Sequence, residues 1–275
     1  MHKFASFNRQ IKSASEIYLS AVSSATFYGR SVFTTVAVYH AKPFQWEKHW
    51  RRLTENAARI GVDLSSFSEQ EIKISIDALI SENSFQNGRM RLTFFDESGN
   101  GIWSLAVESK TSLLITTADF RAISGNFCLT VSPFQVNSKS PLANLKLGNY
   151  LENILALEEA RRRGFDEAIC LNEKGEIVSA IMANIFWVSR DTIFTTPLET
   201  GALKGTTRDF IIENFKVLEK KANLDELKSA DEIFLTSAGF GIVEVKRFEN
   251  KFRDKFTVSK NVRKFFDDFV QKTEQ

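Results

Sequence analysis

Residues 143–165 read ANLKLGNYLENILALEEARRRGF, and they divide into an extended segment, a turn and a helix. The extended segment ends at Lys146, and a Gly-Asn pair supplies the turn. From Leu151 on, apolar residues recur at helical spacing, and Gly164 stands where helices commonly end. The pattern predicts a helix that begins just after a lysine-bearing turn.

Lys146 is the only charged residue between positions 143 and 150, and leucines flank it on both sides. Burial among apolar neighbours disfavours the charged ammonium and so lowers the pKa of a lysine. A neutral amine can form a Schiff base with a carbonyl group, whereas an ammonium cannot. The alternative interpretation is an exposed loop lysine, which is the commoner situation for this residue type. Lys146 therefore supports a functional interpretation only together with other motifs.

Composition excludes several functional classes. The chain has 275 residues, a net charge of +2 and 25 Phe against 4 Tyr, which is typical of a globular protein with a filled core. The small charge gives no electrostatic reason to expect a nucleic-acid partner. Cys128 and Cys170 lie too far apart in sequence to suggest a metal site, and they fit a reducing compartment. With neither a signal peptide nor a membrane-length apolar run, we expect a soluble cytoplasmic protein.

Alternation and helical periodicity predict a small N-terminal α/β domain over residues 1–119. The polar start, up to residue 28, resembles strand and loop. Expected strands span 32–39, 89–95, 102–106 and 113–117, and expected helices span 46–60 and 66–80. Residues 120–126 carry little periodicity, and we expect them to be an interdomain linker.

A larger C-terminal domain is expected over residues 127–275. Its short strands, spaced closely along the chain, are typical of a barrel-like, strongly curved sheet. They are expected at 127–133, 167–172, 176–179, 184–188, 192–196 and 231–235. Further helices are expected from residue 205 and over 258–270. The predicted fold class is therefore α/β (α+β) with two domains.

Two further stretches contain residues that could bind a ligand or take part in catalysis. His49 and Arg52 lie three residues apart on the first predicted helix, although this spacing alone favours a solvated basic flank. Thr206 and Thr207 open a helix directly after Gly205, an arrangement suited to anions, although an ordinary helix cap is commoner. A Schiff-base lysine, a helix-borne arginine and a Gly-Thr-Thr helix start together describe a site for a phosphorylated aldehyde such as pyridoxal 5'-phosphate.

The order of these motifs resembles the fold-type IV pyridoxal-phosphate enzymes, which include branched-chain and D-amino-acid aminotransferases and aminodeoxychorismate lyases. The resemblance covers nearly the whole chain. Six stretches carry it: Tyr-Gly-Arg-Ser-Val-Phe-Thr-Thr at 28–35, His-Trp-Arg-Arg-Leu at 49–53, Lys-Leu-Gly-Asn-Tyr at 146–150, Ala-Asn-Ile-Phe at 183–186, Leu-Lys-Gly-Thr-Thr-Arg at 203–208 and Thr-Ser-Ala at 236–238. Six matches in the family's order are a specific signal.

The resemblance implies a role for each matching residue. Lys146 would hold the cofactor as a Schiff base and act as the catalytic acid and base. The implied cofactor-binding residues are Arg52, Lys146, Tyr150, Ser179, Asn184, Thr206, Thr207 and Ser237. Phe33, Arg91 and Ala238 are expected to contact the substrate. The resemblance also implies a homodimer, with the site between the two domains and near the partner chain, and no metal.

Two positions depart from the family pattern. The family usually places a glutamate against the pyridine nitrogen of the cofactor, five residues before the strand asparagine, and this chain has Ser179 there. A serine hydroxyl suits a neutral nitrogen, so the cofactor would withdraw electrons less strongly. Where some relatives carry a carboxylate-binding arginine, this chain has Phe94 and Phe95, and Arg89 or Arg91 could take its place.

Three functions follow from the resemblance. The first is transamination of a branched-chain or related amino acid. The second is elimination of pyruvate, as in aminodeoxychorismate lyases, which residues 33–35 and 183–187 resemble somewhat more closely. The third is a cofactor-binding protein that has lost catalysis, which Ser179 would suggest and the retention of Lys146 opposes.

Overall fold

The computed structural model describes residues 1–99 and 109–272. The chain forms two compact units, which we describe separately. Unit 1 comprises residues 1–120 together with Lys146–Tyr150, and unit 2 comprises residues 121–145 and 151–275. The sequence-based division placed residues 146–150 in the C-terminal domain, whereas here they pack with the N-terminal part. No helix within the described ranges has the length and apolarity needed to cross a membrane.

Unit 1 is built on a six-stranded sheet whose neighbouring strands all run antiparallel. In spatial order the strands are β2 (Gln10–Ser13), β1 (Phe4–Phe7), β6 (Thr111–Ala118), β5 (Gly88–Asp96), β3 (Ser31–Tyr39) and β4 (Lys42–Pro43). The expected strands at 32–39, 89–95 and 113–117 correspond to β3, β5 and β6. The strand expected at 102–106 lies outside the described residues.

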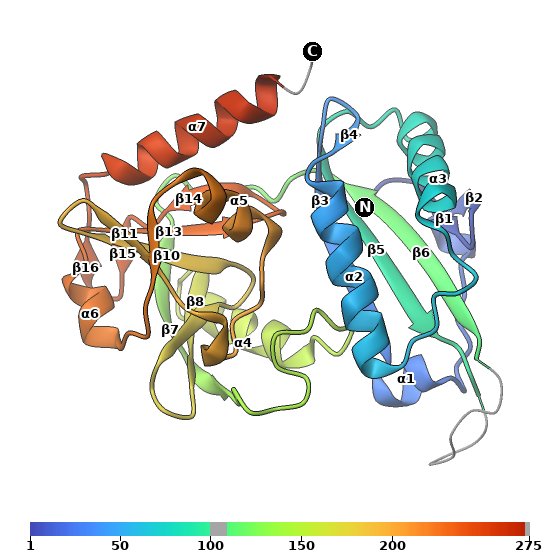
Figure 1. Cartoon of the computed structure of the whole chain (residues 1–275), viewed down its shortest axis with the longest axis horizontal. Coiled ribbons are helices and arrows are strands. Elements are labelled where there is room, and N and C mark those ends of the chain that lie inside the picture. The colour runs from blue at the N-terminus through green and yellow to red at the C-terminus, as the bar shows by residue number, and fades with distance from the viewer. Residues whose placement is uncertain (100–108, 273–275) are drawn as a thin grey trace. The chain divides into compact units, whose positions relative to one another are not determined.

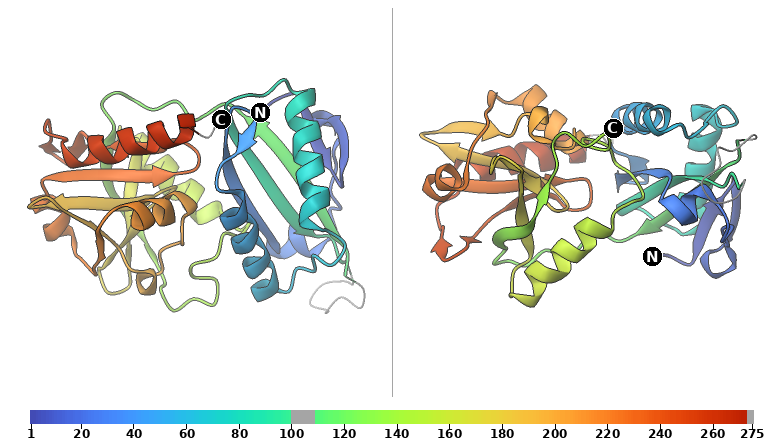
Figure 2. Two further views of the ribbon diagram at one scale, coloured as in Figure 1. Left: turned by 45° about the horizontal axis from the view of Figure 1, so that its top comes forward. Right: turned by 90° about the horizontal axis from the view of Figure 1, so that it is seen from below.

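Two helices cover one face of this sheet, as Figure 1 and the right-hand view of Figure 2 show. Helix α2 (Trp46–Ile60) packs against β3, and α3 (Glu69–Glu82) packs against β1 and β2. Gly61 ends α2 in the left-handed conformation, which favours glycine. A capping box formed by Ser68 and Glu71 begins α3. Both helices lie where the periodicity predicted them.

The N-terminal segment contains more regular structure than the expected strand and loop. It contains the β1–β2 hairpin, a 3-10 turn (Ala14–Glu16) and a short helix, α1 (Ser24–Tyr28). Strands of four residues give too little alternation to be distinguished from polar loop sequence. The α1 helix, which the sequence did not predict, is capped by the Ser23 side chain, which accepts from the Thr26 amide.

Unit 2 contains two five-stranded sheets. One has the order β12 (Val217–Glu219), β11 (Thr192–Thr195), β10 (Asn184–Ser189), β13 (Glu232–Ser237) and β14 (Gly241–Glu244). The other has the order β16 (Lys251–Phe252), β15 (Arg247–Phe248), β7 (Cys128–Val136), β8 (Glu167–Asn172) and β9 (Ile177–Ala180). Strand β9 also contacts β10, so the sheets curl into a half-barrel and the predicted α/β fold class with a curved sheet is confirmed.

The core of unit 2 is apolar and is drawn from both sheets, with fully buried members such as Ile169, Ile185, Trp187 and Leu235. Four helices surround it: α4 (Leu151–Arg162), α5 (Thr206–Asn214), α6 (Leu224–Ser229) and α7 (Val258–Lys272). Helix α7 packs on β13 and β14 (Figure 2, left view). Its first amides donate to the buried Glu232 carboxylate, which explains where the helix begins.

Candidate active site

The Lys146 segment is held at the edge of β3. The Phe33 amide donates to the Lys146 carbonyl at 3.1 Å, and the Gly148 amide donates to the Ser31 carbonyl at 2.8 Å. Leu147 forms an isolated antiparallel bridge with Val32 between them. A Cβ on Gly148 would lie 1.9 Å from the Ser31 Oγ atom, so glycine permits this approach. Strand pairing therefore fixes the backbone of the lysine within unit 1.

The Lys146 amine lies against two aromatic rings. Its Nζ atom is 4.4 Å from the centre of the Phe33 ring and 5.0 Å from the centre of the Tyr150 ring. The two rings meet edge to face, with their centres 5.2 Å apart. Burial, followed by the positive charges of Arg52 and Arg91, holds the pKa of Lys146 well below its ordinary value. This environment favours the neutral, nucleophilic amine.

Arg91 completes this cluster from β5. Its Cζ atom lies 3.6 Å from the centre of the Phe33 ring, and its Nε atom donates to Thr93 Oγ1 at 3.2 Å. Arg89 and Arg91 are two residues apart on one strand, so both side chains point to the same face of the sheet. Arg91 lies opposite Thr35 and Arg89 opposite Ala37, farther from Phe33 along the strand pairing. The structure thus brings Arg91 to the lysine cluster.

His49 and Arg52 reach the same region from α2. His49 is 1 % exposed, and its Nδ1 atom lies 2.7 Å from Thr34 Oγ1. Arg52 donates from Nη2 to the same Thr34 oxygen at 2.9 Å. Burial, followed by the charges of Arg52, Lys146 and Lys48, keeps the pKa of His49 well below its ordinary value. The alternative interpretation of these residues as a solvated basic flank is therefore wrong for His49, which is buried and neutral.

In unit 2, the Asn184 side chain contacts the loop before α5. The Asn184 Nδ2 atom donates to the Leu203 carbonyl at 2.8 Å. A Cβ on Gly205 would lie 1.9 Å from Asn184 Oδ1, so the loop passes this side chain closely because residue 205 is glycine. Gly205 is the N-cap of α5 and offers no side chain to the first helical amides. Thr206 and Thr207 follow it, both buried.

A further hydroxyl lies across the sheet from Asn184. Thr236 is directly opposite Asn184 in the β10–β13 pairing, and its Oγ1 atom is buried with no hydrogen-bond partner in the described part of the chain. Strand β13 packs against α5. Ser237, the residue that the family resemblance pointed to, has its Oγ atom accepting from the Gly239 amide at 3.1 Å. The sequence analysis selected Ser237 and not Thr236, because the Thr-Ser-Ala motif does not reveal which of its two hydroxyls lacks a hydrogen-bond partner.

These features of unit 2 fit a phosphate group. The N-cap residue of helix α5 makes no side-chain hydrogen bond to the first amides of the helix, and threonine hydroxyls lie next to these amides. The Thr236 hydroxyl, which has no hydrogen-bond partner in the described part of the chain, lies on the strand that packs against the helix. Helix N-termini and hydroxyl donors are the usual ligands of phosphate oxygens. Ala238 follows Ser237 in the turn after β13 and is half-buried.

Ser179 lies on β9 opposite Cys170 of β8. Neighbouring carboxylates are engaged elsewhere: Glu176 accepts from Asn172 Nδ2 at 2.8 Å, and Glu167 accepts from the Met182 amide at 2.8 Å. Glu167 is fully buried, and burial raises its pKa to about 7. Neither carboxylate takes the place of the glutamate that the family pattern would have at position 179.

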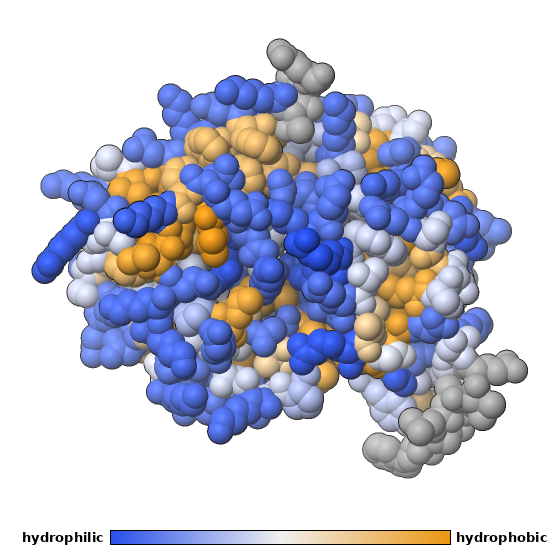
Figure 3. Space-filling view, viewed as in Figure 1, coloured by the Kyte–Doolittle hydropathy of each residue, from blue (hydrophilic) through white to orange (hydrophobic). Residues whose placement is uncertain are grey.

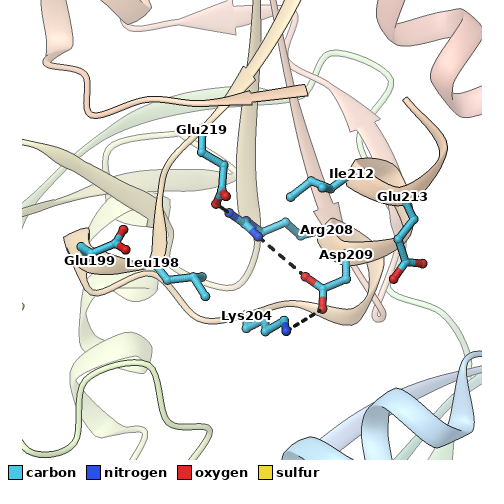
Figure 4. A pocket seen from close by; sticks show the side chains of 8 residues that line it. All are labelled: Leu198, Glu199, Lys204, Arg208, Asp209, Ile212, Glu213 and Glu219. Atoms are coloured by element: carbon cyan, nitrogen blue, oxygen red, sulfur yellow. Dashed lines mark hydrogen bonds and ion pairs between the residues drawn. The ribbon is translucent and has the colours of Figure 1, made fainter. Parts of the chain in front are cut away.

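An open pocket of about 350 Å³ lies beside α5, as Figure 4 shows. Its lining residues are Leu198, Glu199, Lys204, Arg208, Asp209, Ile212, Glu213 and Glu219. The buried Arg208 is paired with Glu219 and donates to the Thr196 carbonyl at 2.9 Å, while Lys204 lies 3.7 Å from Asp209. Four carboxylates against two cations disfavour a phosphate in this pocket.

Comparison with known proteins shows which family this chain resembles. A family model described as "Amino-transferase class IV" matches residues 31–248. A putative branched-chain-amino-acid aminotransferase of Methanocaldococcus jannaschii is 27% identical over 245 residues, 85% of this chain and 83% of that protein. An aminodeoxychorismate lyase of Bacillus subtilis is 28% identical over 240 residues, 84% of this chain and 82% of that protein.

The fold also has close structural counterparts. A crystal structure of the Escherichia coli branched-chain amino acid aminotransferase superposes with a TM-score of 0.91. It covers 98% of this chain and 95% of that one, at 24% sequence identity. At this level of identity the match establishes the fold.

Proposed function

The chain belongs to the class IV aminotransferase family, and from that membership we propose that it transaminates a branched-chain or related amino acid. Its cofactor is pyridoxal 5'-phosphate. The observation that carries the proposal is the Lys146 amine, whose pKa is lowered by burial and by two arginines. A lysine in this state is suited to covalent chemistry with an aldehyde.

Residues from both units would hold the cofactor. Arg52 of α2 would bind the phosphate by charge, together with the α5 amides and the hydroxyls of Thr206, Thr207 and Ser237. The Tyr150 hydroxyl would donate to the ring oxygen. Asn184 would act by holding the loop before α5, since it already binds the Leu203 carbonyl. When bound, the cofactor supplies an aldehyde for the amine and a ring that accepts electrons from the substrate Cα.

Lys146 would move the proton. The Lys146 amine would take the proton from the substrate Cα as a general base and would then return it as a general acid. The lowered pKa of Lys146 supports this role, because a base needs to be unprotonated near neutral pH. Phe33 and Tyr150 limit the movement of the amine by contacting it on two sides.

Substrate recognition is assigned to unit 1 residues near the lysine. Arg91 would bind a substrate carboxylate, and its stacking on Phe33 would keep the guanidinium in place. Phe33 would contact the substrate side chain, and so would Ala238 of unit 2. Ser179 would face the pyridine nitrogen and leave it neutral, which would slow transamination relative to relatives with a glutamate.

A second candidate function is elimination of pyruvate from aminodeoxychorismate. The observations that favour it are the similarity to the Bacillus subtilis lyase and residues 33–35 and 183–187, which resemble the lyases somewhat more closely. Both reactions begin with the same removal of a proton by Lys146. Because the two functions differ only after that step, product analysis distinguishes them.

Absorption spectroscopy tests the proposal. The purified protein, with Lys146→Ala as control, is mixed with pyridoxal phosphate and then with a panel of L- and D-amino acids. We expect a visible band that the variant lacks, and an amino acid that converts it to the pyridoxamine form. Pyruvate formed from aminodeoxychorismate without that conversion would favour the lyase. A band that no substrate changes would indicate a binding protein without catalysis, and no band at all would refute the assignment.

We also propose that the enzyme is a cytoplasmic homodimer. Leu151, Ile154 and Leu155 of α4 expose 41–63% of their surface, and such apolar surface is typical of interfaces. Both cysteines are free thiols, as in reducing compartments. Light scattering of the purified protein should give twice the 31.2 kDa chain mass. A monomer, or recovery of the protein outside the cytoplasm on cell fractionation, would contradict this part.

A further inference from the structure

Three side chains from β3 and α2 are linked by two hydrogen bonds in unit 1. Arg52 Nη2 lies 2.9 Å from Thr34 Oγ1, and the same oxygen lies 2.7 Å from His49 Nδ1. Thr34 and His49 are each 1 % exposed. Thr34 lies 15 positions before His49 and 18 positions before Arg52 in the sequence. The fold, and not a local turn, therefore brings Thr34 to the two residues of the helix.

The direction of one of the two hydrogen bonds follows from the chemistry of the groups. A guanidinium only donates, so the Thr34 oxygen accepts from Arg52. A hydroxyl oxygen has one hydrogen and two lone pairs, so Thr34 either donates to His49 Nδ1 or accepts from it, according to the tautomer of the imidazole. With either tautomer, Thr34 bridges Arg52 and His49.

The charge state of His49 is compatible with this bridge. Burial lowers the pKa of His49, and so do the cations that face it: Arg52 and Lys48 from its own helix and Lys146 from the segment at the edge of β3. An imidazolium would add a positive charge beside Arg52 in a buried site. The lowered pKa therefore favours the neutral imidazole at neutral pH.

We propose that Thr34 and His49 are positioning residues that orient the Arg52 guanidinium toward the phosphate group of the cofactor. The inference rests on the proposed function, which assigns the phosphate to Arg52. Neither Thr34 nor His49 is proposed to touch the cofactor. Their effect is to hold Arg52 in the rotamer that binds phosphate.

Arginine benefits from such support. A free arginine side chain samples many rotamers, and binding costs the entropy of fixing them. A guanidinium recognises a phosphate through a planar pair of donors, so its orientation matters as much as its position. Thr34 is β-branched and lies within strand β3, where its χ1 angle is restricted. It can therefore hold Nη2 at a fixed point and so fix the orientation of the guanidinium.

The test compares Thr34→Val, which removes the hydroxyl at nearly constant volume, with Thr34→Ser, which keeps it. The apoenzymes are titrated with pyridoxal 5'-phosphate and, in parallel, with pyridoxal, which lacks the phosphate. We expect Thr34→Val to raise the Kd for pyridoxal 5'-phosphate about tenfold and Thr34→Ser to change it about twofold or less. The Kd for pyridoxal should stay within about twofold of wild type in both variants, because the role concerns only the phosphate.

A double-mutant cycle separates positioning from general damage. In an Arg52→Ala background, Thr34→Val should have no further effect on the Kd for pyridoxal 5'-phosphate, since the residue that it orients is gone. Thr34→Ala also lacks the hydroxyl and provides the same comparison if the valine variant does not fold. His49→Asn retains an acceptor near the Nδ1 position and should lose less affinity than His49→Leu.

Other outcomes would overturn the inference. If Thr34→Val binds pyridoxal 5'-phosphate as the wild type does, or weakens pyridoxal equally, Thr34 does not act through Arg52 on the phosphate. Additive effects of Thr34→Val and Arg52→Ala would lead to the same conclusion. Failure of the proposed function would look different, because the wild-type protein itself would then not bind pyridoxal 5'-phosphate.

Discussion

At the scale of single residues, the surroundings of Lys146 determine what its amine can do. Two aromatic rings contact it, and two arginines contribute to lowering its pKa. An ammonium placed over rings gains some cation–π energy, but burial and like charges oppose the charged form, and the net shift of the pKa is downward. These surroundings thus favour a neutral amine over a charged ammonium.

Glu167 makes the stability of the fold depend on pH. Burial raises its pKa in the folded state from 4.5 to about 7. A carboxyl with a raised pKa stabilises the fold below its unfolded pKa, and this contribution is lost as the pH rises through the folded pKa. We therefore expect the free energy of unfolding of the wild type, relative to Glu167→Gln, to fall by about 3 kcal/mol between pH 4.5 and 8. Urea unfolding across this range measures the difference.

Glu173 provides a matched control of opposite sign. Hydrogen bonds from Ser138 lower its pKa to about 2, so its contribution is present above 4.5 and is lost only at lower pH. Glu173→Gln should leave the slope between pH 4.5 and 8 unchanged. A Glu167→Gln variant whose slope equals that of the wild type would show that Glu167 is already ionised in the folded protein at pH 5.

The sequence drew attention to Lys146 and predicted that burial would lower its pKa, and burial is the largest cause of the lowered pKa. The flanking leucines suggested burial, and Leu147 is indeed buried. The groups that surround the amine, however, come from β3, β5 and α2, which are distant in sequence. Likewise, the His-x-x-Arg spacing indicated a shared helix face, but only the fold reveals that Thr34 lies between the two side chains.

At the scale of secondary structure, the pairing of residues 146–148 with the edge of β3 positions the lysine. Gly148→Ala should weaken this pairing, because its Cβ would meet the Ser31 Oγ atom at 1.9 Å and the Ser31 Cβ atom at 3.2 Å. We expect a loss of about 1–2 kcal/mol in the free energy of unfolding. Gly125→Ala is the control, since nothing lies within 4 Å of the added carbon.

Ser31→Ala tests the cause of that loss. It removes the oxygen that the new Cβ would meet, so the double variant should recover part of the stability that Gly148→Ala loses. Denaturant unfolding of the four proteins provides the cycle. Equal losses for Gly148→Ala with and without Ser31→Ala would mean that the clash with the hydroxyl is not the cause.

The aromatic contacts of α7 provide a second prediction at this scale. Phe266 is 3% exposed and meets Phe210 edge to face at 5.5 Å between ring centres, whereas Phe265 is 40% exposed. Apolar surface gathers around α7 on the face seen in Figure 3. We expect Phe266→Ala to cost about 3–5 kcal/mol and Phe265→Ala about 1 kcal/mol. Thermal unfolding of both variants tests this, and equal costs would contradict the burial argument.

Helices were easier to predict than short strands. The periodicity of α2 and α7 and the Ser68 cap of α3 agree closely with the structure, because each pattern extends over several turns. Strands β14, β15 and β16 were not predicted. They are two to four residues long, and pairing with other strands defines them more than their own sequence does.

At the scale of the whole chain, the order of the elements along the sequence does not reveal their partners. Residues 146–150 leave the C-terminal part of the chain and pack with unit 1, whereas α4 follows immediately in unit 2. A domain boundary predicted from composition lies at one place in the sequence. This chain, however, crosses from one unit to the other more than once, so one boundary does not describe it. The run of short strands in unit 2 predicted a strongly curved, barrel-like sheet. It did not predict the order of the strands within the two sheets.

Reductive trapping shows whether Lys146 holds the cofactor. The protein is incubated with pyridoxal 5'-phosphate, reduced with borohydride, digested and mapped by mass spectrometry. We expect a single phosphopyridoxyl group on the peptide that contains Lys146, and its loss in Lys146→Ala. A label spread over exposed lysines, or none under conditions that label a known member of the family, would refute the role proposed for Lys146.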